Sequence, residues 1–368
     1  MQGCFSLRIA FLQVGPGVGP ITNNNFRFSQ ELVKHGHTVD LVGTNVAQST
    51  YDNAPGTIRI VSLQSKSNLA TIRGLAAYLQ REKPDYLLPS GPVMHVVSAV
   101  AKIVARSSVK IYTRTHIETS LYLKERGYLN RQALRFLLWS VKNVADGHIA
   151  ASRGAADDLA QVLGLPREEV SVLYNPPIDD EILALSHCDV DHPWIAERKT
   201  PVIVCVARLV EQKGIDTLVS AMHLVNRKRE ARLIILGEGS LRSRLEKQAV
   251  DLGVENVIDF HGHVTNPFAF MRKADLFVLS ANYEGFANVV AEALACGCPV
   301  VSTDAPSGPR EILSDGEFGT LVPVRQPEAL SEAILAALEV RHDSSRLVER
   351  GMQFHVRNVT ADLLSLLK

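Results

Sequence analysis

The sequence has few cysteines, no net charge and no long apolar run. Its five cysteines are scattered along 368 residues, with only Cys296 and Cys298 close together, so neither a disulfide framework nor a zinc site is expected. No window reaches the roughly 18 to 20 uninterrupted apolar residues that a membrane-spanning helix requires. The apolar start of the chain has no small-residue cleavage site behind it, so no signal peptide is predicted. We therefore expect a cytoplasmic protein, soluble or peripheral to a membrane.

The zero net charge hides an uneven distribution. Residues 1–175 carry 19 Lys and Arg against 12 Asp and Glu, whereas the remainder carries 20 against 27. Nine basic residues and only two acidic ones lie between Lys102 and Lys142. Part of this segment, NRQALRFLLWSVKNV, mixes basic, aromatic and aliphatic residues. Two interpretations stay open: an amphipathic helix docked in a domain core, or a surface that recruits anionic lipid.

Apolar, β-branched runs alternate with helical stretches along most of the chain. The runs LRIAFLQV, TVDLVGT, IRIVSL, PDYLLPS and VKIYTRT predict strands of a first sheet, and the alternation restarts with PVIVCVARL. This pattern is typical of a doubly wound parallel α/β sheet, and the chain is longer than one core usually supports. We expect two such Rossmann-like domains, residues 1–178 and 179–350, with a proline-bearing linker at about 176–200.

The first strand is followed by a glycine-rich loop, FLQVGPGVGP. Gly15, Gly17 and Gly19 resemble a dinucleotide-binding turn, but the position of its third glycine is occupied by Pro20. Asp40 lies at the distance of a ribose-binding acid, yet TVDLVGT places it inside a strand. An NAD site is therefore disfavoured. A plain tight turn and a loop that faces a cleft between the domains both remain, and we favour the second.

The linker contains a second apparent motif, HCDVDHP at residues 187–193. Its Asp-x-Asp spacing is used by metal-dependent sugar transferases of another fold, in which the motif ends a strand. No strand precedes it here. We therefore interpret these residues as solvated linker charge and expect no metal site.

Two strand ends in the second half carry cations and glycines. Arg208 and Lys213 follow the strand in VCVARLVEQKG and precede a helix, which is a favourable place for a diphosphate. Gly237 and Gly239 follow the next strand, in LGEGSL, and can bring backbone amides close to the same ligand. Because ligands of open parallel sheets bind at the carboxyl ends of the strands, we expect these residues to line one site.

A third strand end carries two acids. Glu284 follows ADLFVLS, and Glu292 comes eight residues later in a helix that we expect to begin near Phe286, about 12 Å further along its axis. The two carboxylates cannot grip one atom, but they can hold hydroxyls at opposite ends of a nucleotide sugar. The amides of Phe286, Ala287 and Asn288 can add to the anion site.

The second half closely resembles the retaining glycosyltransferases of family 4, which have the two-domain GT-B fold. The matching segments include ARLVEQKGIDTL, ILGEGSLRSRLE, DFHGHV, YEGFANVVAEALACGCPVVSTDAPSGPREIL and GTLVPV. The likeness is thinner in the first half, where it includes YTRTHIE and ADGHIAASRGAADDL. The chain end, residues 351–368, is similar to the family's last helix, which returns to the first domain.

The resemblance implies a role for each site residue. It assigns Arg208 and Lys213 to the donor diphosphate, Glu284 to the donor sugar and Glu292 to the ribose. Gly285, next to Glu284, is also expected to bind the donor. The resemblance also implies that His116 lies near the sugar, although a core histidine is the alternative. The backbone around His263 and Val264 is expected to face the nucleotide base. The loop with Gly17 and Gly19 would face the acceptor, and its departure from the family pattern leaves the acceptor undefined.

The implied reaction transfers a hexose or N-acetylhexosamine from a nucleotide sugar, most simply a UDP-sugar, with retention and without a metal or cofactor. The acceptor would be a hydroxyl of a lipid-linked or surface-polysaccharide glycan, and no nucleic acid is expected to bind. Two alternatives remain. A nucleotide-sugar 2-epimerase would need its own acid–base pair, and a non-catalytic nucleotide-sugar-binding relative is disfavoured because the whole donor constellation is intact.

Overall fold

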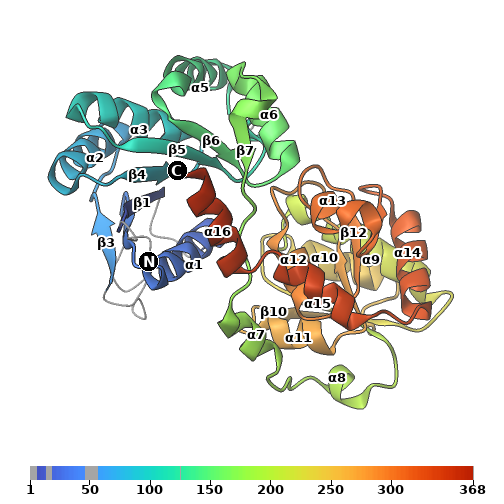
Figure 1. Cartoon of the computed structure of the whole chain (residues 1–368). Helices are drawn as coiled ribbons and strands as arrows, with labels where there is room; N and C mark the ends of the chain where they lie inside the picture. Colours follow the sequence, from blue (N-terminus) through green and yellow to red (C-terminus); the bar gives the residue numbers. More distant parts are fainter. Residues whose placement is uncertain (1–5, 14–18, 46–56, 125, 368) are drawn as a thin grey trace. The chain divides into compact units, whose positions relative to one another are not determined.

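The computed structural model describes residues 6–13, 19–45, 57–124 and 126–367. The chain forms two compact units, Met1–Pro176 with Val356–Lys368 and Pro177–His355, called unit 1 and unit 2 (Figure 1). The sequence placed the corresponding boundaries at 178 and 351. The last helix, α16 (Val356–Leu366), therefore belongs to unit 1 although it ends the chain.

Unit 1 is built on a seven-stranded parallel sheet in the order β3-β2-β1-β4-β5-β6-β7. Its strands are β1 (Arg8–Gln13), β2 (Thr38–Gly43), β3 (Ile58–Ser62), β4 (Tyr86–Pro89), β5 (Lys110–Thr115), β6 (Gly147–Ala150) and β7 (Val170–Val172). Its helices, besides α16, are α1 (Pro20–Lys34), α2 (Asn68–Glu82), α3 (Pro92–Ala105), α4 (Thr119–Lys124), α5 (Tyr128–Val141) and α6 (Arg153–Leu163).

Strand β1 shows why the apolar runs are continuous. Ile9 and Phe11 pack against α1 and α16, whereas Ala10 and Leu12 pack against α2 and α3 on the other face. Alternate residues of a strand point to opposite faces, so a strand covered on both sides has a continuous apolar run, which is residues 9–12 in β1. The core of unit 1 thus consists of two layers separated by the sheet.

Unit 2 repeats this winding with a six-stranded parallel sheet in the order β10-β9-β8-β11-β12-β13. Its strands are β8 (Val202–Val206), β9 (Arg232–Leu236), β10 (Ile258–Gly262), β11 (Leu276–Leu279), β12 (Val300–Thr303) and β13 (Thr320–Val322). Its helices are α7 (Asp180–Ser186), α8 (Pro193–Glu197), α9 (Ile215–Asn226), α10 (Arg242–Asp251), α11 (Pro267–Lys273), α12 (Asn288–Ala295), α13 (Pro309–Ile312), α14 (Pro327–Glu339) and α15 (Ser344–Met352). The predicted class, two doubly wound α/β domains, is confirmed.

The segment expected to be a linker is largely ordered structure of unit 2. It contains α7 and α8, and α7 packs against α11. The interpretation of HCDVDHP as solvated charge is wrong for His192, which is only 4% exposed and caps α8 by accepting a hydrogen bond from the Trp194 amide. It fits Asp189, which is exposed and pairs with Lys273.

Asp40 lies inside β2, as the sequence predicted, and its carboxylate is already engaged. Arg59 donates to both of its oxygens at 2.9 and 2.8 Å, and the Tyr78 hydroxyl donates to it at 2.5 Å. A ribose would have to displace these partners in a fully buried position. The structure thus agrees with the rejection of a dinucleotide site.

None of the helices in the described part of the chain has both the length and the apolar character needed to cross a lipid bilayer.

Candidate functional site

The candidate site of unit 2 lies where the direction of winding reverses. The chain proceeds from β8 to β9 and β10 on one side and to β11, β12 and β13 on the other. The loops that follow β8 and β11 therefore leave adjacent strands at the same edge of the sheet, the usual ligand position in such folds. The first loop carries Arg208 and Lys213, and the second carries Glu284.

Lys213 and Glu284 meet directly across these loops. The Lys213 ammonium lies 2.5 Å from Glu284 Oε1, and the two side chains are 16% and 7% exposed. At this depth the pair is only weakly screened by salt. The sequence assigned the two residues to different parts of a ligand, and their mutual ion pair is a feature that it did not predict.

Gly214 makes this contact sterically possible. It has a left-handed φ of 56°, and a Cβ at this position would lie 2.2 Å from the Ser280 carbonyl oxygen. The Ser280 hydroxyl in turn donates to the Lys213 carbonyl at 2.9 Å. Only glycine allows the turn after β8 to approach the end of β11 this closely, so Gly214 fixes the position from which Lys213 reaches Glu284.

Arg208 is exposed and is linked to the same group through Gln212. Its Nη2 lies 3.5 Å from Gln212 Oε1, and Gln212 Nε2 donates to the Tyr283 carbonyl at 3.1 Å. Arg208 forms no ion pair with any carboxylate of the described chain. Its guanidinium is thus available to an anion beside the pair of Lys213 and Glu284. Sequence reasoning missed Gln212, although its position between two candidate cations was a usable signal.

Gly237 and Gly239 are required by backbone packing. Cβ atoms at these positions would lie 2.0 Å from the Ala207 carbonyl oxygen and 2.3 Å from that of Leu209. The turn after β9 therefore packs against the loop that carries Arg208, and the Leu209 amide donates to the Glu238 carbonyl at 3.0 Å. This packing accounts for both glycines, and their predicted contact with a ligand stays a prediction.

The helix that carries Glu292 begins at Asn288, two residues after the expected start near Phe286. Ala287 has a left-handed φ of 63°, which interrupts helical geometry immediately before the first turn. The Phe286 carbonyl is packed against Gly308, where a Cβ would lie 2.5 Å from it. Gly285 and Phe286 thus belong to the loop after β11, next to Glu284, and only Asn288 belongs to the first turn.

Glu292 is half-buried on α12, one turn before Cys296. Burial, and secondarily the charge of Glu292, raises the pKa of the Cys296 thiol to about 12. The neighbours of Glu292 on the helix, Val290, Ala291, Ala293 and Leu294, are buried, which agrees with the expectation that Glu292 lies among apolar residues. Its assignment to a ribose stays a prediction.

His263 and Val264 follow β10 directly. The Gly237 amide donates to the Gly262 carbonyl at 2.7 Å, so these two residues lie beside the turn after β9 at the same edge of the sheet. His263 is exposed, whereas Val264 packs partly into an apolar cluster with Ile195 and Phe270. Their predicted role is a backbone contact with a nucleotide base. Such a contact depends on where these residues lie and not on their side chains, so it stays a prediction.

His116 belongs to unit 1, where it follows β5 and is 8% exposed. Its Nε2 lies 3.2 Å from the Ser90 hydroxyl. Burial, and next the positive charge of Arg114, lowers the pKa of His116 to about 3, so the imidazole is neutral at physiological pH. Of the predicted acceptor-side glycines, Gly19 precedes the first residue of α1 in an extended conformation, and Gly17 lies outside the described residues.

Arg114 is a buried cation that sequence reasoning passed over. It is 2% exposed, donates to Asn25 Oδ1 at 2.8 Å, and lies over the Phe28 ring at 4.9 Å from its centroid. Burial lowers the pKa of its guanidinium to about 10. Its place inside a predicted strand of a doubly wound sheet, KIYTRT, was the signal, because a charged residue that is buried there must be paired or packed on aromatic rings.

The buried histidines of unit 1 predict a specific loss of stability in mild acid. Burial lowers the pKa of His95 to about 4 and that of His116 to about 3, whereas an unfolded histidine titrates near 6.5. Their contribution to stability is complete above about pH 6.5 and is lost as the pH falls toward the folded pKa values, because the unfolded chain binds more protons. We expect about 2 kcal/mol per histidine to be lost by pH 5.

Hydrogen exchange of the β5 and α3 amides at pH 7 and pH 5 measures this loss. The variant His116→Asn should reduce the pH dependence, whereas His35→Asn, at an exposed position after α1, should leave it unchanged. Equal pH dependence in wild type and His116→Asn would contradict the assignment of a neutral, buried imidazole.

His192, Asp259 and His261 form a cluster with the residue types of a metal site, and their ligand atoms lie within 4.8 Å of one another. His192 Nδ1, however, accepts a hydrogen bond from the Trp194 amide, so its Nε2 carries the proton that is donated to Asp259 Oδ2 at 3.0 Å. A metal would need that Nε2 without its proton. The cluster is therefore explained as a hydrogen-bonded anchor that holds the α8 region against β10.

Comparison with known proteins matches both units to glycosyltransferase families. Residues 192–354 match the family described as glycosyl transferases group 1, and residues 24–181 match glycosyltransferase family 4. A Campylobacter jejuni N-acetylgalactosaminyltransferase that acts on an undecaprenol-diphosphate-linked glycan is 29% identical over 66% of this chain and 64% of its own. A Rhizobium meliloti lipopolysaccharide core glycosyltransferase is 35% identical over 50% of this chain and 52% of its own. The chain thus spans less than two thirds of either relative.

Solved structures share the fold over nearly the whole chain. A glycosyltransferase from Rickettsia africae has a TM-score of 0.81 at 15% identity, covering 99% of this chain and 98% of its own. An Anabaena protein, Alr3699/HepE, solved with UDP and glucose, has a TM-score of 0.77 at 20% identity, covering 98% and 99%. Together these matches confirm the resemblance noted in the sequence. The chain belongs to the group 1 glycosyltransferases of family 4, and its units are the two Rossmann-like domains of the GT-B fold.

Proposed function

We propose that this protein transfers a hexose or N-acetylhexosamine residue from a nucleotide sugar to a hydroxyl of a lipid-linked or surface-polysaccharide glycan, with retention of the anomeric configuration. The observation that carries the proposal is the ion pair of Lys213 with Glu284 beside Arg208, which has no carboxylate partner in the described chain, at the switch point of the unit 2 sheet. Cations at this edge suit a diphosphate, and a fixed carboxylate next to them suits a sugar hydroxyl.

The chemistry follows from this placement of charge. As the bond between the sugar C1 and the phosphate oxygen breaks, the electron pair stays on the diphosphate, and Arg208 and Lys213 stabilise the developing negative charge. The acceptor oxygen bonds to C1 from the same face, and its proton passes to the departing phosphate oxygen. Glu284 holds Lys213 in place and positions the sugar, and it forms no covalent bond. Because two cations serve the leaving group, the reaction needs no divalent metal or cofactor.

The identity of the donor is proposed from similar proteins. The Anabaena neighbour was solved with UDP, with UDP-glucose, and with UDP and glucose. The turn after β9 and the start of the loop after β10, with His263 and Val264, offer backbone groups to a base at the same edge as Arg208. We therefore propose a UDP-sugar, with Glu292 directed to the ribose.

The acceptor and the location are proposed from the relatives and from the charge of unit 1. Both relatives described above are named for transfer to lipid-linked or lipopolysaccharide glycans. An acceptor of this kind lies at a membrane surface, and the segment from Lys102 to Lys142 is strongly basic. We propose that the protein works at the cytoplasmic face of the membrane as a peripheral protein, with Gly17 and Gly19 on the acceptor side and the neutral His116 near the sugar.

A panel of UDP- and GDP-sugars tests the donor assignment. A ligand at 100 times its dissociation constant stabilises the folded state by about 2.7 kcal/mol, which raises the melting temperature of unit 2 by several degrees. We expect one UDP-sugar to do so equally well with and without EDTA. The control is uridine, which lacks the diphosphate and should have a much smaller effect. Stabilisation only in the presence of a divalent metal, or by no nucleotide sugar, would contradict the proposal.

A further inference from the structure

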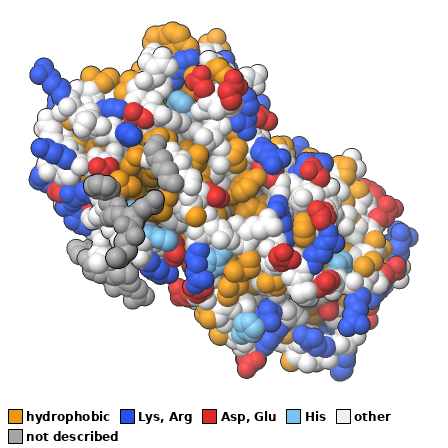
Figure 2. All heavy atoms as spheres, in the orientation of Figure 1, with side chains coloured by type: hydrophobic (Ala, Val, Ile, Leu, Met, Phe, Trp, Pro, Cys, Tyr) orange, Lys and Arg blue, Asp and Glu red, His pale blue; other side chains and the backbone are white. Residues whose placement is uncertain are grey.

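Helix α5 in unit 1 leaves most of its large apolar side chains in solvent. Only Leu134 and Leu138 of its residues are buried. The exposed fractions of the large apolar residues are 66% for Tyr128, 81% for Leu129, 65% for Phe136, 44% for Leu137 and 55% for Trp139. These five residues are called the α5 surface below. In Figure 2, hydrophobic atoms gather at the edge of unit 1 where α5 lies in Figure 1. A patch of this kind marks an interaction site in a folded protein.

The α5 surface is preorganised on a fixed helix. The Phe136 and Trp139 rings stack at 6.3 Å between centroids. The Lys142 ammonium lies 5.9 Å from the Trp139 ring and donates to the carbonyls of Leu163 and Gly164 at 3.0 and 3.1 Å. Lys142 thereby fastens the end of α5 to the end of α6. The aromatic residues are therefore presented by a helix that is anchored at its base.

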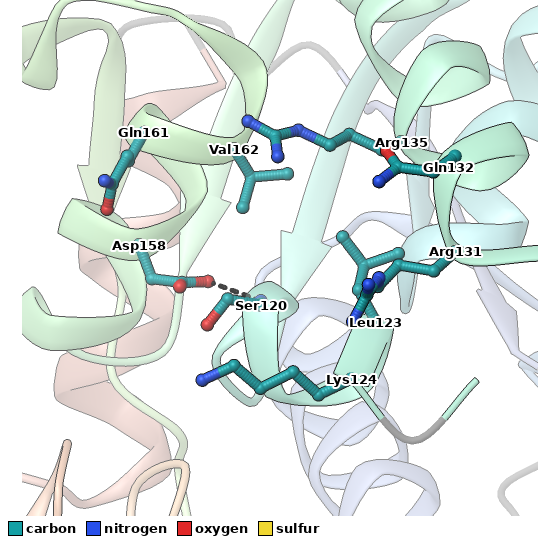
Figure 3. A pocket seen from close by; sticks show the side chains of 9 residues that line it. All are labelled: Ser120, Leu123, Lys124, Arg131, Gln132, Arg135, Asp158, Gln161 and Val162. Carbon is teal, nitrogen blue, oxygen red and sulfur yellow. Dashed lines mark hydrogen bonds between the residues drawn. The ribbon is translucent and has the colours of Figure 1, made fainter. Parts of the chain in front are cut away.

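A basic hollow adjoins the α5 surface between α4, α5 and α6. It has a volume of about 430 Å³, and Lys124, Arg131 and Arg135 contribute to its lining. Figure 3 shows Lys124 and Arg135 reaching across it toward α6. Asp158, the acidic residue of the lining, accepts a hydrogen bond from the Ser120 amide at 2.9 Å. Within the described chain none of the three cations forms an ion pair, so the hollow is arranged to receive an anionic group.

A second hollow joins the two features. It measures about 330 Å³, and its lining includes Arg135, Phe136 and Trp139. Arg135 therefore belongs both to the basic hollow and to the edge of the aromatic patch. Cations beside exposed aromatic rings match the cross-section of an anionic phospholipid layer, in which the headgroup phosphate lies above the acyl boundary.

From this arrangement we propose that the α5 surface is an interfacial membrane anchor, which lies in the plane of an anionic bilayer. Tyr128, Leu129, Phe136, Leu137 and Trp139 enter the acyl boundary, and the hollow of Lys124, Arg131 and Arg135 holds a lipid phosphate. We choose an anionic membrane as the partner because of charge complementarity. Helix α5 contains Arg131 and Arg135 and no acidic residue, so a second copy of this surface would bring like charges together. This inference assigns specific residues to the proposed membrane location. It rests on the proposed function only for the reason why the protein would bind a membrane.

Trp139 provides a direct readout, because the chain has two tryptophans and the other is Trp194 of unit 2. In the full-length variant Trp194→Phe, we expect vesicles with 30% phosphatidylglycerol to shift Trp139 emission to shorter wavelength, and brominated acyl chains to quench it. Pure phosphatidylcholine vesicles should have little effect. Unchanged emission with the anionic vesicles, or equal binding to both compositions, would overturn the proposal.

Matched variants show whether vesicle binding depends on this surface or on exposed basic and apolar residues anywhere in unit 1. Each Lys or Arg near an anionic surface contributes about 1 kcal/mol, so Arg131→Gln with Arg135→Gln should weaken vesicle binding about 30-fold. As a control, Arg73→Gln on α2 and Lys83→Gln directly after α2 replace two exposed cations. This pair should change vesicle binding little. Phe136→Ser should weaken binding, and the exposed control Leu69→Ser should not. Equal losses in variants and controls would overturn the proposal.

Two further measurements complete the test. Sedimentation velocity without vesicles should show a monomer for the wild type and for Phe136→Ser. A wild-type dimer that is lost in Phe136→Ser would mean that the α5 surface binds a second copy of the chain. Transfer to a short, lipid-free glycan should proceed at the same rate in Arg131→Gln/Arg135→Gln and wild type. If vesicles bind as predicted and no transfer occurs, the proposed function fails and the anchor stands. If transfer occurs and vesicles do not bind, the anchor fails alone.

Discussion

Replacing Lys213 by alanine should reduce turnover by about 10² to 10³, the effect of removing one preorganised electrostatic contact from a reaction centre. The loss should appear mainly in kcat, because the negative charge on the leaving diphosphate grows as the bond to the sugar breaks. Arg208→Ala should cause a loss of the same order. Single-turnover and steady-state rates with a saturating donor and a short glycan acceptor measure both effects.

Lys247→Ala provides the matched control for these variants. Lys247 is exposed on α10 of the same unit, and in the described chain no ion pair joins it to the loops that follow β8 and β11. It should retain the wild-type rate. A Lys213→Ala enzyme within a few-fold of the wild-type turnover would show that this ammonium does not serve the leaving group.

The ion pair of Lys213 with Glu284 predicts a second large effect, on stability. The pair is mostly buried, and removing one partner of a buried pair leaves an uncompensated charge that costs about 3 to 5 kcal/mol. We expect Glu284→Leu to lower the free energy of unfolding of unit 2 by this order. The double variant Lys213→Met/Glu284→Leu should regain most of it, because an apolar pair of similar volume replaces the buried charges.

Stability and catalysis should separate in this cycle. The double variant is expected to fold well and to be inactive, since two of the groups proposed to serve the donor are gone while Arg208 remains. Urea unfolding followed by Trp194 fluorescence in a Trp139→Phe background reports unit 2 alone, because Trp194 is then the one tryptophan left. The single variants for comparison are Lys213→Met and Glu284→Leu. If their losses simply add in the double variant, with no recovery, the two side chains do not stabilise one another.

The alternation of strands and helices was predictable because both sheets are covered on both faces. The middle of β1, residues 9–12, is apolar at every position, and such a run in the sequence cannot be confused with a half-exposed strand. Arg208, Lys213 and Glu284 could be selected for the same reason, since each follows such a run within a few residues. Polar residues at the ends of parallel strands lie at the ligand-binding edge in any doubly wound sheet.

Features that depend on tertiary neighbours were not predictable. Lys213 and Glu284 are 71 residues apart, and their contact follows from the pairing of β8 with β11, which no local pattern specifies. The start of α12 at Asn288 depends on the left-handed Ala287, whose conformation is imposed by packing of the loop against Gly308. A helix period in the sequence cannot show where such packing interrupts the helix.

The same limit explains the errors in the segment 176–200. Its prolines and charges are typical of a linker, yet α7 packs on α11 and His192 is buried against Asp259 and Phe270. The burial of His192 depends on β10 and α11, which lie more than 60 residues further along the chain. Composition describes the segment correctly as polar, and only the tertiary structure shows which of its polar side chains are covered.

The most direct test of the account is a crystal structure of the protein with a UDP-sugar bound. We expect oxygens of the diphosphate within about 3 Å of both the Arg208 guanidinium and the Lys213 ammonium, with the sugar against Glu284. A diphosphate bound elsewhere, with Lys213 and Glu284 still paired and no ligand beside them, would contradict the central claim that this switch point of unit 2 is the donor site.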